Sequence, residues 1–375
     1  MSSQVYDAIV IGAGIVGAAC AESLSREGLR VAIVERDLVG GGATAAGMGH
    51  IVVMDDSEAQ FALTRYSQQL WKEMRAELPP DVEYQQCGTL WIAADEEEMA
   101  EVLRKREYYT QHDVPVSVID GDTLADLEPN LRKGMAGALL VPEDAVVYPP
   151  CAARFLFERS QRRGAEAFLG LTVQQIDDGS VQLSDGTRLC AAVIVSATGA
   201  SAPKLTPGLD IKMRKGHLVI TDRHPDFVRH QLVELGYLKS AHSLTSDSVA
   251  FNVQPRSTGQ ILIGSSRQYG IEYKQVDDLI LSRMLQRALE YMPGLDKTSA
   301  IRTWTGFRAA TPDKLPLIGR WPENQSLLLA TGHEGLGITT SLGTAALIAD
   351  QVMGRTPAIP IEPYTPARAF APAHA

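Results

Sequence analysis

Three glycines close to the start of the chain constrain its fold more than any other feature: Gly12, Gly14 and Gly17. They follow an apolar, β-branched run over residues 6–11, which predicts a buried strand. Residues 18–27 then predict a helix, and residues 30–35 predict a second buried strand that ends on Glu35. A strand, a glycine turn, a helix and another strand form the beginning of a parallel, doubly wound α/β sheet.

Each part of this motif has its own physical reason. Gly12 permits a tight turn, Gly14 lets the backbone approach a pyrophosphate, and Gly17 lets the helix pack against the strand. The helix N-terminus offers free N–H groups and a positive partial charge to phosphate. Glu35 stands near the spacing of an acid that binds ribose hydroxyls, and its charge disfavours a 2′-phosphate. The motif therefore predicts a dinucleotide site, and the alternative is a glycine-rich turn that binds no nucleotide.

Length and charge narrow the architecture and the partners. At 375 residues the chain is too long for one ordinary core and predicts two domains. A net charge of −10 argues against nucleic acid or an anionic membrane as the main partner. The N-terminal residues lack the basic and apolar segments of a signal peptide, and no apolar run is long enough for a transmembrane segment. We therefore expect a cytoplasmic protein.

The four cysteines are scattered, and none belongs to a C-x-x-C pair: Cys20, Cys87, Cys151 and Cys190. This pattern favours reduced thiols over a disulfide framework. It offers no recognisable zinc or iron–sulfur ligand set, so we expect no metal site in the chain.

The pattern over the rest of the chain predicts a group of strands inserted into an outer α/β domain. Helices are predicted over residues 57–77, 95–109, 152–164, 277–291 and 338–353. Strands are predicted over 190–197 and 326–331, and an alternating, β-rich pattern runs over 215–266. Within the helix over 95–109, Asp95 is the expected cap, and Glu101 and Lys105 are spaced as a pair on a solvated face.

Three further motifs place small or glycine residues beside polar ones. The first, Ala197-Thr198-Gly199, closes a predicted strand, where small residues let the backbone pass close to a cofactor. The second is Gly306-Phe307-Arg308. The third, Gly332-His333-Glu334-Gly335, precedes the last predicted helix, whose N-terminal amides would stabilise an electron-rich ring edge.

Together with the first motif, these blocks resemble the D-amino-acid-oxidase-type flavoproteins, the family of glycine oxidase, sarcosine oxidase and D-amino acid dehydrogenase. The likeness also includes Gly47-Met48 and Pro142-Glu143-Asp144, so it covers nearly the whole chain. Its C-terminal block, through Thr340, is most similar to the flavin subunits of D-hydroxyproline dehydrogenase, hydrogen cyanide synthase and opine oxidase. The resemblance implies an α/β protein with a Rossmann-type FAD-binding domain and an inserted, β-rich α+β substrate domain. We expect the FAD-binding domain over residues 1–83, 140–215 and 305–375, and the substrate domain over 84–139 and 216–304.

The resemblance also implies which residues bind FAD. The ADP half would lie on Gly12, Ala13, Gly14, Ile15, Val16, Gly17, Glu35 and Arg36, with Val173 on the adenine side. The pyrophosphate and flavin would meet Thr44, Ala45, Gly47, Met48, Thr198 and Gly199. The pyrimidine edge would be lined by Gly332, Gly335, Leu336, Gly337, Ile338 and Thr339. Members of the sarcosine-oxidase type link their flavin to a cysteine near the C-terminal block. No cysteine lies beyond Cys190 in this chain, so the resemblance implies that the FAD is bound non-covalently.

Arg308 matches the arginine that clamps the substrate carboxylate in this family, and the alternative is a structural ion pair with Asp313. Glycine-oxidase-like members carry a tyrosine in the strand before the Pro-Arg turn, and here Phe251 or Asn252 takes the place of that tyrosine. Asn252 is therefore expected to contact the substrate, and Met48 is expected to contact it as well. Three histidine and acidic candidates remain open between chemistry and support of a loop: His50, His333 and Glu334. Tyr237 and Tyr269 are candidates either for the pocket or for the apolar core.

The activity that the resemblance implies is oxidation of the C–N bond of a small D-amino or cyclic imino acid by hydride transfer to FAD. D-Hydroxyproline and D-proline are the first candidates, and glycine oxidase, hydrogen cyanide synthase and opine oxidase are the alternatives. An iron–sulfur or other redox partner subunit is expected to accept the electrons and could hold the chain at a membrane surface. A non-catalytic, FAD-binding electron-relay subunit is the rival from another class.

Overall fold

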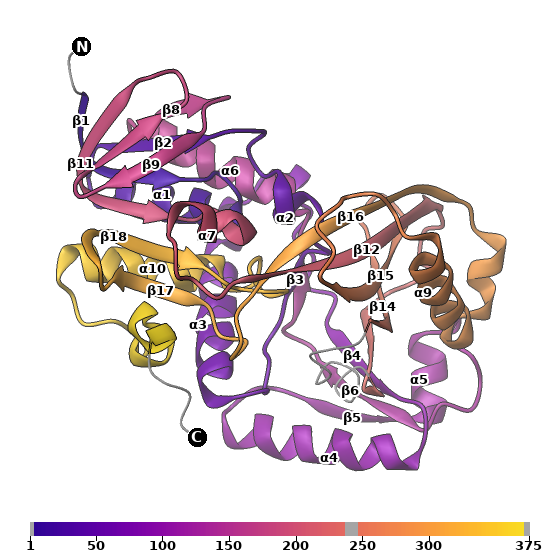
Figure 1. Cartoon of the computed structure of the whole chain (residues 1–375). Coiled ribbons are helices and arrows are strands. Elements are labelled where there is room, and N and C mark those ends of the chain that lie inside the picture. The colour runs from indigo at the N-terminus through magenta and orange to yellow at the C-terminus, as the bar shows by residue number, and fades with distance from the viewer. Residues whose placement is uncertain (1–3, 237–246, 371–375) are drawn as a thin grey trace.

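The computed structural model describes residues 4–236 and 247–370 and shows two large β-sheets that face each other across the middle of the molecule (Figure 1). Each sheet contains eight strands within the described residues, and β3 (His50–Ile51) and β7 (Ala145–Val146) form a small third sheet between them. The two large sheets divide the elements much as the sequence suggests, and the division into two domains stays a proposal.

The first sheet has the order β17-β18-β11-β1-β2-β8, with β10 and β9 as an attached hairpin. Its strands are β1 (Gln4–Ile11), β2 (Val31–Glu35), β8 (Glu166–Leu169), β9 (Val173–Asp177), β10 (Ser180–Leu183), β11 (Arg188–Ser196), β17 (Leu317–Trp321) and β18 (Asn324–Thr331). β1 pairs in parallel with both β11 and β2, and β18 pairs in parallel with β11. The carboxyl ends of these four strands therefore meet at one edge, where doubly wound sheets bind their ligands.

Three helices cover one face of this sheet: α1 (Ile15–Arg26), α6 (Pro149–Arg162) and α10 (Ser341–Met353). Their apolar side chains form one buried core with β1 and β11, and α3 (Glu58–Met74) packs on α10. A second core lies on the opposite face, under α7 (Ala202–Leu205) and the β9–β10 hairpin. Short 3₁₀ turns join the elements: η1 (Arg75–Glu77), η2 (Pro80–Val82), η3 (Gly199–Ser201), η4 (Pro293–Lys297), η5 (Glu362–Tyr364) and η6 (Pro366–Phe370).

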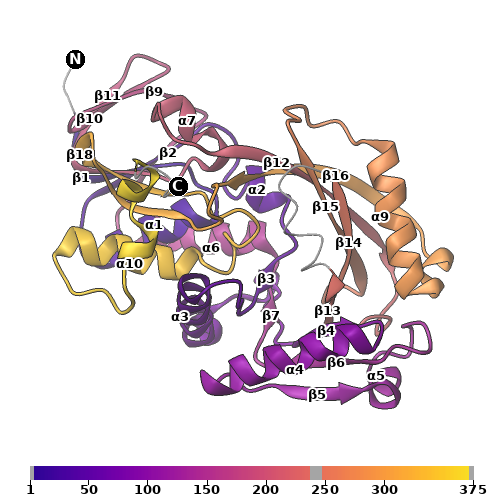
Figure 2. The same ribbon diagram turned by 60° about the horizontal axis from the view of Figure 1, so that its bottom comes forward.

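The second sheet has the order β16-β12-β15-β14-β13-β4-β6-β5. Its strands are β4 (Thr89–Ala93), β5 (Ser117–Asp120), β6 (Gly137–Val141), β12 (Lys212–Arg223), β13 (Gln231–Glu234), β14 (Ser248–Pro255), β15 (Gln260–Tyr269) and β16 (Ala300–Ala310). α9 (Asp278–Tyr291) covers the outer face of β14 and β15, while α4 (Glu96–Gln111) and α5 (Gly121–Leu127) flank β4–β6 (Figure 2). The inner face of β12, β15 and β16 is turned toward α2 (Gly42–Ala45) and the loop that follows α2.

The predicted helices and strands agree with the structure to within about three residues at each end, and the first helix is one of those whose start is shifted by three. It begins at Ile15 rather than at residue 18, because Gly14 itself serves as its N-cap. The last helix begins at Ser341, three residues later than predicted, after turns that continue through Thr340. The predicted cap of α4 is confirmed, since Asp95 accepts a hydrogen bond from the Glu98 N–H at 2.9 Å.

The prediction that Lys105 lies on a solvated helix face is wrong. Its side chain is fully buried and pairs with Asp55, and its Nζ lies 4.6 Å from the centre of the Trp91 ring. Glu101 pairs instead with Arg104. Helical spacing identifies residues that share a face, but it does not say which face packs against the sheet.

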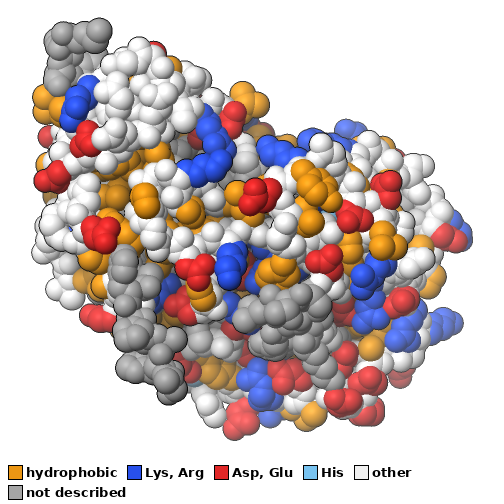
Figure 3. All heavy atoms as spheres, viewed as in Figure 1, with side chains coloured by type: hydrophobic (Ala, Val, Ile, Leu, Met, Phe, Trp, Pro, Cys, Tyr) orange, Lys and Arg blue, Asp and Glu red, His pale blue; other side chains and the backbone are white. Residues whose placement is uncertain are grey.

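Acidic and basic side chains are interspersed on the face of the molecule in Figure 3. None of the helices over residues 4–236 and 247–370 is long and apolar enough to cross a membrane. All four cysteines are free, and burial raises the pKa of Cys20 to about 12. Within the described ranges, no cluster of three or more His, Cys, Asp or Glu side chains could hold a metal ion.

Candidate cofactor and substrate site

The glycine motif lies at the carboxyl edge of the first sheet, and its shape explains two of the three glycines. Gly12 has a φ of +100°, and a Cβ there would come within 2.8 Å of the Ala197 carbonyl oxygen. A Cβ on Gly17 would come within 1.9 Å of the Gly12 carbonyl oxygen. A Cβ on Gly14 would meet only the Thr44 hydroxyl, at 3.3 Å. The first two glycines are required by packing of the chain itself, whereas Gly14 leaves space beside the helix N-terminus.

Glu35 and Thr44 both reach this helix N-terminus. One carboxylate oxygen of Glu35 accepts a hydrogen bond from the Ala13 N–H at 2.6 Å, and the other accepts one from the Asp37 N–H at 2.8 Å. The Thr44 hydroxyl accepts a hydrogen bond from the Ile15 N–H at 3.0 Å. The acid predicted for the ribose thus stands against the glycine turn, and Thr44 stands where a pyrophosphate would approach α1. Arg36 is exposed and pairs with Asp37, and Ala45 is exposed at the end of α2.

The strand-closing motif lies directly beside the glycine turn. The Ala197 N–H donates to the Ile11 carbonyl at 2.9 Å, so Ala197 and Thr198 lie beside the end of β1 at the carboxyl edge of the sheet. Gly199 has a φ of +54°, and its carbonyl accepts a hydrogen bond from the Thr331 hydroxyl at 3.1 Å. Val173 opens β9 and is buried in the core on the same side as Ile11. These small residues leave the cradle open to a dinucleotide such as FAD.

The C-terminal block meets both the glycine motif and the loop after α2. A Cβ on Gly337 would lie 3.9 Å from Val16, and a Cβ on Gly47 would come within 2.5 Å of the Ile338 side chain. The Thr339 hydroxyl donates to the His50 carbonyl at 2.7 Å. Residues predicted to bind FAD from three distant parts of the sequence therefore lie side by side, and Gly332, Gly335 and Leu336 belong to the same C-terminal block.

A row of glycines crosses the inner face of the second sheet opposite this region. Gly306 on β16 pairs with Gly216 on β12, and Gly264 lies on the neighbouring strand β15. Added Cβ atoms at these three positions would meet the Ala46 Cβ at 2.2 Å, the Arg308 guanidinium at 2.6 Å and the Met48 sulfur at 2.9 Å, respectively. The glycines thus form a low floor on which Arg308 and Met48 lie side by side.

Arg308 extends across this floor rather than toward Asp313. Its Nη1 donates to the Ser266 carbonyl at 2.9 Å, and its Nε lies 3.8 Å from the position that a Cβ on Gly335 would occupy. Asp313 forms its ion pair with Arg368, at 2.7 Å. The predicted carboxylate clamp is therefore held between the glycine floor and the C-terminal block.

Two more arginines share this face. Arg214 is the cross-strand neighbour of Arg308, forms an ion pair with Glu334 and lies 4.6 Å from the centre of the Tyr269 ring. The Arg267 Nε lies 4.0 Å from the same Glu334 carboxylate. Glu334 has a left-handed backbone with a φ of +48°, which turns its side chain toward these two arginines. This geometry favours a loop-holding role for Glu334.

A second, uncharged polar cluster lies on the inner face next to Gly264. Asn252 pairs with Gly264 across the sheet and is 7% exposed, and Gln254 is fully buried two residues further on. Burial lowers the pKa of His50 to about 4, the charge of Arg308 lowers it as well, and the neighbouring Gln254 side chain opposes both effects. Among the described residues, hydrogen-bonding partners are lacking for the buried atoms Asn252 Oδ1, Gln254 Oε1, Gln254 Nε2 and His50 Nε2.

The structure places Phe251 and Asn252 on opposite faces. The Phe251 ring stacks on Tyr291 of α9, with ring centres 4.4 Å apart, on the outer side of the sheet. Asn252 is therefore the residue that occupies the inner face at the predicted position. Tyr269 lies against Arg214, and Tyr237 lies outside the described residues.

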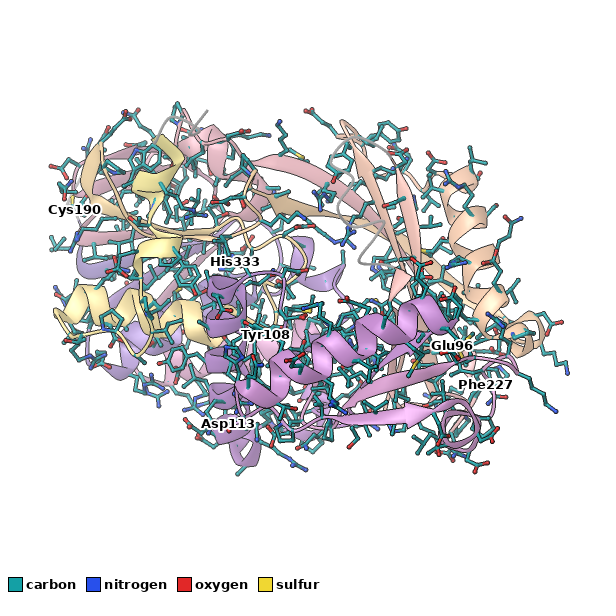
Figure 4. The ribbon with its side chains drawn as sticks, turned by 90° about the horizontal axis from the view of Figure 1, so that it is seen from below. Glu96, Tyr108, Asp113, Cys190, Phe227 and His333 are labelled. Atoms are coloured by element: carbon teal, nitrogen blue, oxygen red, sulfur yellow. The ribbon has the colours of Figure 1, made fainter. Side chains whose placement is uncertain are left out.

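His333 lies inside the molecule between the two sheets (Figure 4). Its Nε2 bonds the Thr344 hydroxyl of α10 at 2.9 Å, and burial lowers its pKa to about 3. A ring that is neutral and turned into α10 supports the loop, so this geometry does not favour the catalytic role predicted for His333.

Sequence reasoning missed several residues that build the floor and the two polar clusters: Arg214, Gly216, Gln254, Gly264 and Arg267. Gln254 could have been found, because strand alternation puts it on the same face as Asn252. The other four lie on β12 and β15, where a register shift interrupts the alternation. Their arrangement depends on pairing between strands that the sequence alone does not specify.

Comparison with known proteins agrees with this geometry. A family profile described as FAD dependent oxidoreductase (DAO) matches residues 7–351. The chain is 27% identical to glycine oxidase from Geobacillus kaustophilus, over 96% of each chain. It is also 27% identical to hydrogen cyanide synthase subunit HcnC from Pseudomonas aeruginosa, over 98% of this chain and 97% of that one.

Similarity extends to the solved structures. The crystal structure of glycine oxidase from Geobacillus kaustophilus matches with a TM-score of 0.87 and 26% identity, covering 97% of this chain and 98% of that one. The glycine cradle, the Glu35 contacts and the matched profile lead to one conclusion. The chain belongs to the DAO family of FAD-dependent oxidoreductases and is an enzyme that uses FAD.

Proposed function

We propose that this enzyme oxidises the C–N bond of a small D-amino or cyclic imino acid, with D-hydroxyproline or D-proline as the preferred substrate. The observation that carries the proposal is the position of Arg308 on a floor of glycines beside the loop of Met48. An arginine offers a planar, permanently charged fork that binds a carboxylate through two parallel hydrogen bonds. The names of the relatives, which include a glycine oxidase and a hydrogen cyanide synthase subunit, support an amino-acid substrate.

In this proposal the protein binds and orients, and bound FAD supplies the hydride acceptor. Arg308 holds the carboxylate and Met48 covers the substrate, so that the α-carbon is presented in one orientation. His50 carries no charge at neutral pH, because its pKa is near 4, and it would accept a hydrogen bond from the substrate nitrogen. The substrate loses a hydride from the α-carbon and a proton from nitrogen, which leaves an imine.

The arginine cluster favours a second candidate, an opine-type substrate with a further carboxylate. Among the described residues, Arg214 and Arg267 both lie against the carboxylate of Glu334, and Arg214 is the cross-strand neighbour of Arg308. Glycine oxidase and hydrogen cyanide synthase activities remain alternatives, and a substrate as small as glycine would need only the Arg308 clamp.

A substrate panel tests the proposal. The holoenzyme is mixed with D-proline, 4-hydroxy-D-proline, glycine and an opine, with a dye acceptor in the presence and absence of oxygen. We expect bleaching of the flavin by a D-imino acid, fast turnover with the dye and slow turnover with oxygen. A flavin that no amine bleaches anaerobically would support the rival reading, a non-catalytic electron-relay subunit. Stoichiometric peroxide at the full rate would contradict the expected partner subunit.

A further inference from the structure

We propose that Asn252 and Gln254 form a second recognition site, which binds a hydroxyl group on the substrate at the end away from Arg308. The inference rests on the proposed function and specifies its substrate class as hydroxylated amino or imino acids. These two residues are called the polar subsite below.

The polar subsite is built from unsatisfied, buried groups that converge. Asn252 and Gln254 are two residues apart on β14, so their side chains leave the same face of the sheet. Both are more than nine-tenths buried. Within the described residues, Asn252 Oδ1 and the two polar atoms of Gln254 have no partner in good hydrogen-bonding geometry, although Gln254 lies close enough to His50 to raise the pKa of that ring. Leaving a buried donor or acceptor unpaired destabilises a protein, so native structures supply a partner in nearly every case. A ligand that enters this site would be that partner.

The position of the polar subsite fits a substrate held by Arg308. The Arg308 guanidinium lies over Gly216 on β12 and reaches the Ser266 carbonyl on β15. The next strand is β14, where Asn252 pairs with Gly264. Neighbouring strands are about 4.8 Å apart, so a small ring bound by its carboxylate would bring its far substituent to Asn252. Met48 lies over Gly264, between the two ends of the site.

The chemistry of the polar subsite favours a hydroxyl over a second carboxylate. A hydroxyl both donates and accepts, and Gln254 offers a donor and an acceptor while Asn252 Oδ1 offers an acceptor. A carboxylate only accepts, so it would face the Asn252 oxygen without a proton between them. A negatively charged substituent would also prefer the arginines around Glu334.

The test uses paired substrates that differ by one hydroxyl. Rates are measured with a dye acceptor for 4-hydroxy-D-proline against D-proline and for D-serine against D-alanine. We expect the wild-type enzyme to prefer the hydroxylated member by at least ~10-fold in kcat/KM, because polar groups left unpaired by the analogue disfavour it. In Gln254→Met and Asn252→Leu, this preference for the hydroxylated member of each pair should fall ~10-fold or more.

Gln268→Met is the matched control. Gln268 is a buried glutamine of the same sheet, but its side chain faces outward and donates to Asp277 at 3.0 Å. Its removal should leave the hydroxyl preference unchanged. FAD content is measured in all variants, since loss of FAD in Gln254→Met would mean that the cluster serves the flavin and would overturn the proposal.

A binding measurement covers the case in which none of these amines is oxidised, which would contradict the proposed function. Tetrahydrofuran-2-carboxylate and its 4-hydroxy form have no C–N bond, and their binding is followed through the flavin spectrum. Tighter binding of the hydroxy form, lost in Gln254→Met, supports the polar subsite even then. Equal binding of both forms, or an unchanged preference in both variants, would mean that solvent satisfies these atoms and that no hydroxyl is recognised.

Discussion

The cofactor edge of the first sheet and the inner face of the second sheet are built in different ways. At the cofactor edge, the backbone determines the shape of the site. Gly12 and Gly17 stand where an added Cβ would collide with a main-chain carbonyl, and Glu35 and Thr44 accept hydrogen bonds from main-chain N–H groups. On the inner face, side chains determine the shape of the site. Arg308 and Met48 lie on a floor of glycines that come from separate strands, and Gln254 is buried on the strand β14. The first region is therefore nearly the same for any substrate, whereas the second determines which substrate is bound.

Glycine substitutions at the cofactor edge should have the largest effect and should separate packing from binding. Gly17→Val places a side chain against the Gly12 carbonyl, so we expect loss of FAD and a free energy of unfolding lowered by ~3 kcal/mol. Gly14→Val should also abolish FAD binding, because its side chain would occupy the pyrophosphate path. This substitution should lower the free energy of unfolding of the apoprotein by only ~1 kcal/mol, since the added side chain meets the Thr44 hydroxyl alone.

The measurements are FAD content after purification and denaturant unfolding of the apoproteins. The distinction between the two glycines would be lost if Gly14→Val unfolded as easily as Gly17→Val, or if either variant retained FAD.

On the inner face, Arg308→Ala should weaken the binding of carboxylate ligands by ~2–5 kcal/mol without loss of FAD. Arg308→Lys should restore this only in part, because a point charge cannot make two parallel bonds. Binding is followed through the flavin spectrum, with FAD content measured beside it. Unchanged carboxylate affinity in Arg308→Ala would place the clamp elsewhere, and loss of FAD or of the fold would return Arg308 to a structural role.

This contrast also explains how much the sequence could predict. The cofactor edge follows from contiguous motifs, so the positions of Gly12, Glu35 and Gly199 were predictable from local spacing. The inner face depends on register between β12, β15 and β16, which is set by packing across the whole sheet. Lys105 shows the same limit, since its spacing indicated a helix face but not its burial beside Asp55.

His333 links the two regions and should control how stability depends on pH. Its pKa in the folded protein is about 3, below the ordinary value of 6.5, because burial disfavours the charged ring. Below pH 6.5 the unfolded chain therefore binds more protons, and stability is lost as the pH falls from 6.5 toward 3. The loss attributable to His333 is ~2 kcal/mol between pH 7 and pH 5.

Denaturant unfolding at both pH values checks this, with His333→Gln as the comparison. The variant should be less stable at pH 7 but should lose less stability on acidification. Part of the pH dependence should remain, because His50 is shifted in the same direction. Identical pH profiles for the two proteins would show that His333 is already protonated or exposed in the native state.

The smallest expected effect comes from Gly216→Ala, and it tests whether the glycine floor positions Arg308. An added methyl group at Gly216 would come within 2.6 Å of the guanidinium, which is the far end of a flexible side chain and can move aside. We therefore expect a cost in folding stability below ~1 kcal/mol. Carboxylate affinity should fall by ~1 kcal/mol, about fivefold, because the displaced fork no longer lies where the substrate is held.

Gly306→Ala is the contrasting variant, since its methyl group would meet the Ala46 Cβ at 2.2 Å and should disturb the loop after α2, with loss of FAD. Carboxylate binding that is unchanged in Gly216→Ala would mean that the floor is needed only for packing, and that Arg308 finds its substrate without it.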